Sequence, residues 1–310
     1  MSGYFAPDSM IVRVMSKRAV GYTYGLRALV IGAVHPKLYV GTAANTAHRD
    51  TPYTRLALTG RLFEAVFMGT KDEADRALEF TRRKHVRVNG RLPEHAGPAN
   101  PAGASYSALD PDLMFMTMAF TFDSAEFMHD ALVRRLSAGE REALWQDYVR
   151  WAELFGMPRA AAPASYPEFR AYFDGYLHSG EPYLTDEARL VGTYLAGAKE
   201  PGFPIGPKFA SDEVGRIIRG SLPGRIREMY GIRWGMRDEL RYRAVTAGVR
   251  AAHTRSPVRL PVDLAPVLKG RSALGYKQVA DAEHAALRRG ERSMPDVPVE
   301  SPYPPRDRSA

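Results

Sequence analysis

The sequence of 310 residues predicts an all-α fold, a multi-helix bundle, and three observations support it. Apolar residues recur at helical spacing along most of the chain between residues 26 and 251. Helix start and stop signals bound several of these segments, and strand-like alternation is confined to one weak candidate, Ile11–Val14. The expected helices are, in order, Leu26–Val34, Tyr53–Phe67, Lys71–Val88, Asp112–Arg135, Ala138–Phe155, Tyr166–Tyr176, Thr185–Ala196, Ser211–Arg219, Pro223–Tyr230 and Met236–Ala251.

Local signals fix where helices in this series begin and end. Thr70 and Glu73 form a capping-box pattern at the start of the third expected helix. Gly156 followed by Pro158 ends the fifth, because glycine accepts the left-handed conformation at a helix end and proline cannot continue a helix. These signals agree with the periodicity, which strengthens the helical prediction.

The chain divides by composition into two parts. Residues 1–255 are expected to form a single helical domain, interrupted by a loop at Gly90–Pro111 that is rich in Pro, Gly and Ala. Residues 256–310 form a Pro-rich C-terminal extension that is expected to be partly disordered. Good helix formers predict one more helix within Val267–Arg289.

The composition excludes several kinds of chemistry. The chain has no Cys, which excludes disulfides, iron–sulfur clusters, Cys zinc sites, thiolate-ligated haem and covalent c-type haem. Any metal must therefore be held by His, carboxylate or Lys side chains. Motifs of dinucleotide-binding folds, P-loops, nucleophile elbows and H-E-x-x-H metalloproteases are absent from the sequence.

The formal net charge is +8, and arginines concentrate between Arg216 and Arg259. This pattern fits either a patch for an anionic partner or solvated helix faces with structural ion pairs, and we favour the second because no nucleic-acid motif accompanies it. No signal peptide is evident, and the longest nearly apolar run, Leu113–Phe122, is far shorter than the roughly 20 residues that span a bilayer. We therefore expect a cytoplasmic protein with no transmembrane segment and no specific nucleic-acid partner; the oligomeric state is not indicated.

One histidine, His85, falls on the apolar stripe of an expected helix. An inward-facing His is most often a hydrogen-bonded structural residue, but a buried neutral imidazole is also a good axial ligand for haem iron. The other members of this stripe are Ala74, Leu78, Thr81 and Val88.

The inward face of the expected helix Tyr53–Phe67 begins with Arg55 and Thr59, which lie about one turn apart. Arginine is rarely buried unless it is paired. One interpretation is an arginine that reaches solvent or a carboxylate such as Asp50. The other is an arginine that pairs with a carboxylate or propionate inside a cofactor pocket, beside a threonine that hydrogen-bonds a ligand.

Two further polar features adjoin apolar segments. Pro36 disfavours helical backbone at His35 and so predicts a helix boundary or kink there. Asp123 and Ser124 follow a run of Met and Phe, which is usually core but also suits a large apolar ligand. The remaining histidines are expected to be surface or structural residues: His48, His95, His129, His178, His253 and His284.

In order and spacing, these features resemble a family of bacterial and fungal haem proteins that includes latex-clearing protein (rubber oxygenase) and MpaB-type oxygenases. The resemblance covers a core from Leu26 to about Trp234, two-thirds of the chain. The matching features are His35-Pro36, Gly41, Asp50 near Pro52, Arg55-x-x-x-Thr59, Val66–Thr70, His85–Gly90, Asp123-Ser124 and Leu154–Pro158.

The resemblance implies a globin-like helical arrangement around a non-covalent haem b, with dioxygen as co-substrate. His85 matches the proximal iron ligand of the family, and Arg55 and Thr59 match a pair near its haem pocket that we take as the candidate catalytic residues. His35 and Asp123 complete the candidate set for cofactor binding.

The sequence departs from the family pattern at two positions. Rubber-cleaving members carry a distal lysine ligand where this chain has Leu58, and many members carry a histidine where it has Met118. The departures leave the distal iron ligand unassigned and argue against rubber cleavage itself.

The expected function is a haem b-dependent oxygenase that acts on an apolar small molecule, isoprenoid or lipid-like, or on a secondary metabolite. Three alternatives stay open: a haem dehydrogenase or peroxidase-like enzyme on the same scaffold, a non-catalytic haem- or gas-binding protein, and a helical interaction protein without cofactor whose Arg-rich C-terminal third binds an anionic partner.

Overall fold

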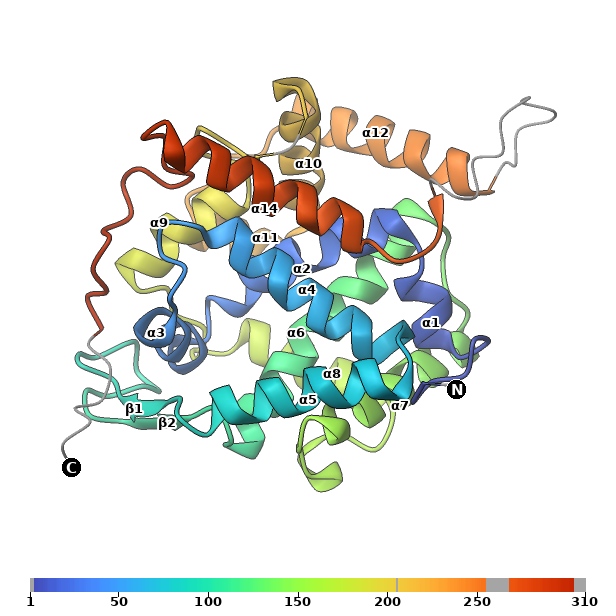
Figure 1. The fold of residues 1–310 in the computed structure, drawn as a ribbon, viewed down its shortest axis with the longest axis horizontal. Coiled ribbons are helices and arrows are strands. Elements are labelled where there is room, and N and C mark those ends of the chain that lie inside the picture. The colour runs from blue at the N-terminus through green and yellow to red at the C-terminus, as the bar shows by residue number, and fades with distance from the viewer. Residues whose placement is uncertain (1–2, 205, 255–267, 304–310) are drawn as a thin grey trace.

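A computed structural model describes residues 3–204, 206–254 and 268–303, and its regular structure is almost entirely helical (Figure 1). The all-α prediction is therefore confirmed. The elements are α1 (Met10–Met15), α2 (Arg18–Gly32), α3 (Pro36–Asn45), α4 (Pro52–Met68), α5 (Lys71–His85), β1 (Asn89–Arg91), β2 (Ser105–Ser107), α6 (Pro111–Leu132), α7 (Ala138–Leu154), the 3-10 helix η1 (Arg159–Ala161), α8 (Tyr166–His178), α9 (Asp186–Leu195), α10 (Lys208–Ser221), α11 (Gly224–Met229), α12 (Met236–Thr254) and α14 (Ala273–Arg288).

The prediction of a weak strand at Ile11–Val14 is wrong, because these residues lie in α1. Met10, Ile11, Val14 and Met15 are all buried, and their spacing places four apolar side chains on one side of a helix. The helix is only six residues long, so its periodicity is too short to distinguish it from a strand by sequence alone. Its stability comes from packing in the core.

The two short antiparallel strands β1 and β2 lie in the expected loop Gly90–Pro111, apart from Asn89, which begins β1 just before it. Gly90 pairs with Tyr106, and the ring of Tyr106 also lies against Gly41 of α3, where an added Cβ would stand 3.1 Å from the ring. Glycine at position 41 thus allows the hairpin to close over α3. This contact brings Tyr106 to the wall of the cavity described below.

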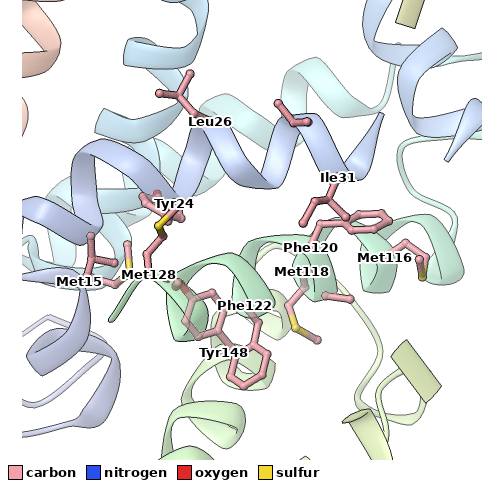
Figure 2. Packing of buried hydrophobic residues seen from close by; sticks show 14 of the residues in the cluster. Met15, Tyr24, Leu26, Ile31, Met116, Met118, Phe120, Phe122, Met128 and Tyr148 are labelled. Carbon is pink, nitrogen blue, oxygen red and sulfur yellow. Dashed lines mark hydrogen bonds between the residues drawn. The ribbon is translucent and has the colours of Figure 1, made fainter. Parts of the chain in front are cut away.

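The core is centred on the packing of α2 against α6. Figure 2 shows Tyr24 and Ile31 on the side of α2 that faces α6, with Phe120 and Met128 opposite. The Met- and Phe-rich run of α6 therefore serves in core packing, and part of it also faces the cavity.

Helix α4 lies between α5 on one side and α14 on the other (Figure 1). Thr70 and Glu73 form the predicted capping box, which starts α5 after a two-residue turn and makes it run back along α4. The expected C-terminal helix is present as α14, while residues 256–267 and 304–310 of the extension, like residue 255 before it, lie outside the described residues.

Most arginines of the basic segment that the structure describes are bonded within the chain. Arg225 donates to the carbonyl oxygens of Leu177 and Ser179, at 2.9 and 2.6 Å, and Arg243 pairs with Glu239 at 2.6 Å. These bonds favour structural roles for the segment. The others bonded in this way are Arg216, Arg219, Arg227 and Arg250.

Buried His129 in α6 predicts an acid-sensitive stability. Burial, aided by the positive charge of Arg134, lowers the pKa of His129 to about 4. Between pH 6.5 and 4 the unfolded chain therefore binds a proton that the folded chain does not, so the free energy of unfolding falls as the pH falls, by roughly 3 kcal/mol over the whole window. Urea midpoints measured from pH 4 to 7 should fall less steeply for His129→Gln than for the unchanged protein, and parallel profiles would contradict this.

Candidate functional site

A cavity of about 1120 Å³ lies among α2, α3, α4, α5, α6 and α14. Its walls are mostly apolar and aromatic, including Phe63, Trp151 and Phe155. Three of the residues singled out by sequence line it: Arg55 and Thr59 from α4 and His85 from the end of α5. Helices α4 and α5 meet at the turn that joins them and diverge toward their other ends (Figure 1). Arg55 and Thr59 near the start of α4 and His85 at the end of α5 therefore lie on two walls of the same cavity.

The guanidinium of Arg55 faces the cavity without a protein partner. Across the described ranges it has neither a hydrogen bond nor an ion pair. Asp50, the carboxylate considered from sequence, is instead paired with Arg292 at 2.9 Å. Burial lowers the pKa of Arg55 to about 10, which still leaves it cationic at neutral pH. A desolvated cation without a counter-ion is costly, and a bound anion would relieve that cost.

The imidazole of His85 is available as a ligand. Burial lowers the pKa of His85, so the ring is neutral at pH 7 and keeps a lone pair free. In the described part of the chain neither ring nitrogen has a hydrogen-bond partner.

Thr59 is oriented by its own helix. Its hydroxyl donates to the carbonyl oxygen of Arg55, one turn earlier, at 3.1 Å. Because the hydroxyl proton is committed to the backbone, the oxygen is left to accept a hydrogen bond from a cavity ligand.

His35 and Asp123 do not line this cavity. His35 lies at the boundary between α2 and α3, as the sequence predicted, and its ring stacks on Tyr176 with 6.1 Å between centroids. Burial lowers the pKa of His35 to about 4.

Asp123 lies in a separate, charged cavity of about 750 Å³. It is paired with Arg27 at 2.6 Å and with Arg170 at 2.5 Å. Burial alone would raise the pKa of Asp123, but these two guanidinium groups outweigh it and hold the pKa below its ordinary value. Asp123 of α6 and Arg27 of α2 therefore form a buried ion pair. Arg27 is only 2% exposed.

The two positions at which the sequence departs from the family pattern behave differently. Leu58 is 40% exposed and does not line the cavity, whereas Met118 is fully buried and does. The substitution at 118 thus makes the cavity wall more apolar, while the leucine at 58 contributes nothing to the cavity.

The sequence interpretation missed His48 as a cavity residue. It lies in the loop between α3 and α4, with ring Nδ1 3.0 Å from Thr51 Oγ1. Burial, with the positive charge of Arg55, lowers the pKa of His48. No local signal marks this residue, because its position depends on how the loop folds against α14.

The C-terminal part of the chain also supplies cavity wall. Tyr276 and Val279 of α14 line it, and so do Met294 and Val297 of the segment that follows. This segment is fastened beside the cavity by Arg292 to Asp50 and by Arg49, whose Nη2 donates to the carbonyl oxygen of Pro298 at 3.0 Å.

Two features that the described residues lack bear on the class of protein. No described helix is both long and apolar enough to cross a membrane. Nor do the described ranges hold a cluster of three or more His, Asp or Glu side chains that could bind a metal ion. A haem iron, which takes a single axial imidazole in many proteins, does not need such a cluster.

Fold and cavity together define a mostly helical protein built around a large apolar cavity, which is lined by the imidazoles of His48 and His85 and by the unpaired guanidinium of Arg55. Residues 12–251 match the family described as ER-bound oxygenase mpaB/B'/Rubber oxygenase, catalytic domain, and the chain therefore belongs to this family. The match confirms the resemblance drawn from sequence and extends it at both ends. No curated protein and no solved structure matches the chain.

Proposed function

We propose that this protein is a haem b-dependent oxygenase that uses dioxygen on an apolar small-molecule substrate. One observation carries the proposal: Arg55, Thr59 and His85, selected separately from sequence, face one cavity in a chain of the MpaB/rubber oxygenase family. An oxygenase-type domain follows from the family; the cofactor and the substrate class are our inference.

The residues present fit a haem. His85 offers a neutral imidazole with a free lone pair, and Arg55 offers an unpaired cation suited to a propionate. Aromatic and aliphatic walls suit a large planar apolar group. When bound, haem would supply redox-active iron for dioxygen chemistry.

Side chains of the protein itself shape the environment of the substrate. Apolar residues such as Met118 and Phe63 exclude water and favour a substrate of low polarity. Thr59 can accept a hydrogen bond from a group bound beside it.

The first experiment is a visible spectrum of the purified protein with a pyridine haemochrome assay after supplementation with haem. We expect a Soret band and about one haem b per chain. Dioxygen consumption in the presence of apolar candidate substrates would then separate an oxygenase from a non-catalytic haem- or gas-binding protein. Absence of a Soret band after supplementation would refute the cofactor assignment.

Replacing Arg55 should weaken haem binding without lowering the stability of the haem-free protein. Arg55→Gln removes a cation that has no protein partner, so we expect the haem-free protein to be as stable as before or slightly more stable. Haem affinity should fall roughly 10- to 100-fold, since a hydrogen bond to a charged group contributes about 1.5–3 kcal/mol. Haem titration and thermal melting measure the two effects.

A matched control lies on the same helix. Arg61 of α4 is exposed and does not line the cavity, so Arg61→Gln should leave haem affinity unchanged. Equal losses of affinity in Arg61→Gln and Arg55→Gln would rule out the role assigned to Arg55.

A further inference from the structure

The first turn of α4 leaves two backbone N–H groups without partners inside the helix. Pro52 has no N–H, and the N–H of Arg55 donates to the carbonyl oxygen of Thr51 at 3.1 Å, which leaves those of Tyr53 and Thr54. The N-cap residue, Thr51, does not cap them with its side chain. A helix start buried in this way needs acceptors from elsewhere in the fold.

Glu283 of α14 supplies both acceptors. Its Oε1 accepts from the N–H of Tyr53 at 3.1 Å, and its Oε2 accepts from the N–H of Thr54 at 2.6 Å. The hydroxyl of Ser293 donates to Oε1 at 2.6 Å and holds the carboxylate in place. Glu283 is 1% exposed, so these contacts are screened little by solvent, and its negative charge also faces the positive end of the helix dipole.

Helix α14 and its N-cap residue contact α4 at two further positions. Midway, the Tyr276 ring lies so close to Gly60 that an added Cβ would stand 2.9 Å from it. At the far end, the backbone N–H of Ser272 donates to Glu64. Three contacts along one helix fix its axial position and its rotation, and Glu283 makes the one nearest to Arg55.

Arg55 follows directly after the two residues that Glu283 holds, and Thr59 lies one turn further. Residue 283 lies outside the residues that match the family, 12–251, so the cap on α4 comes from beyond the matched region. We propose that Glu283 is a positioning residue: by capping α4 from outside the family domain, it sets the register in which Arg55 and Thr59 face the cavity. The part that concerns haem rests on the function proposed above.

The test compares Glu283→Gln with Glu64→Gln. Both variants change a buried carboxylate that accepts from backbone N–H groups where α4 meets α14, but at opposite ends of α4. In Glu283→Gln the amide nitrogen must face the N–H of either Tyr53 or Thr54, so at least one of the two N–H groups loses its acceptor while the shape of the side chain is kept. Both readouts use the haem-free protein. Amide hydrogen exchange at Tyr53 and Thr54 reports on the cap, and the ¹H–¹⁵N resonance of Arg55 Nε reports on the environment of that side chain. The Arg55→Lys variant assigns the resonance.

We expect Glu283→Gln to speed exchange at one or both of these amides at least tenfold, to shift the Arg55 Nε resonance, and to weaken haem binding about tenfold. Glu64→Gln should leave these three quantities near the values of the unchanged protein, even if its melting temperature falls as much. Ser293→Ala, a milder change, should move the same quantities in the same direction and serves if Glu283→Gln does not fold.

Two outcomes would overturn the positioning role. One is an unchanged Arg55 resonance and unchanged exchange in Glu283→Gln; the other is an equal response in Glu64→Gln, which would indicate general loosening of α14. If the unchanged protein binds no haem, the function proposed above fails, and the exchange and resonance measurements alone decide whether Glu283 positions α4.

Discussion

His85→Ala should lower haem affinity at least ~100-fold, because it removes the imidazole that we assign as the axial ligand. Changes to partners that only orient a ligand already cost 10- to 100-fold, so loss of the ligand itself should cost no less. The cavity keeps its apolar walls and Arg55, so some weak, displaceable haem should still bind. Haem titration followed at the Soret band measures the loss.

A rescue and a control make this result specific. Added imidazole should restore the visible spectrum of the unchanged protein in His85→Ala, since the deleted side chain leaves space for it beside the cavity. His95 is exposed and lies outside the cavity, so His95→Ala should bind haem as the unchanged protein does. Full haem retention by His85→Ala would exclude His85 as the ligand.

The site residues on α4 and α5 could be found from sequence because each stands on a helix whose pattern is local. The capping box at Thr70 and Glu73 fixes where α5 begins, and fifteen residues of helix then carry His85 to the other end. The turn and the helix lengths place Arg55 and His85 at the ends of α4 and α5 that lie away from the turn, where both line the cavity. This part of the cavity therefore needs no knowledge of distant contacts.

The rest of the cavity depends on contacts between residues far apart in sequence. His48 faces the cavity because its loop folds between α3 and α4, and the wall formed by Tyr276 depends on the close approach allowed by Gly60. Glu283 lies 230 residues from Tyr53 and 229 residues from Thr54, the two residues whose amides it caps. Periodicity describes one helix at a time, so it does not reveal which helix a carboxylate will cap.

Asp123 shows where local inference leaves two interpretations open. A polar pair at the end of an apolar run fits a cofactor contact as well as a buried ion pair, and only the packing of α2 and α8 on α6 distinguishes them. The structure places Arg27 and Arg170 beside Asp123, in a cavity separate from that of His85. We therefore expect Asp123 to act in folding, which a single variant can test.

Asp123→Ala should lower the free energy of unfolding by roughly 3–5 kcal/mol, because it leaves Arg27 buried without its carboxylate. Chemical denaturation gives this value, and the expected fall in melting temperature is about 10 °C. Asp174→Ala is the matched control: Asp174 pairs with the same Arg170 at 2.5 Å but is exposed, so its loss should change stability by less than about 1 kcal/mol. The haem affinity of folded Asp123→Ala should equal that of the unchanged protein. A variant with full stability and reduced haem affinity would instead return Asp123 to the cofactor site, since a carboxylate needed only by the ligand leaves no buried cation behind when it is removed.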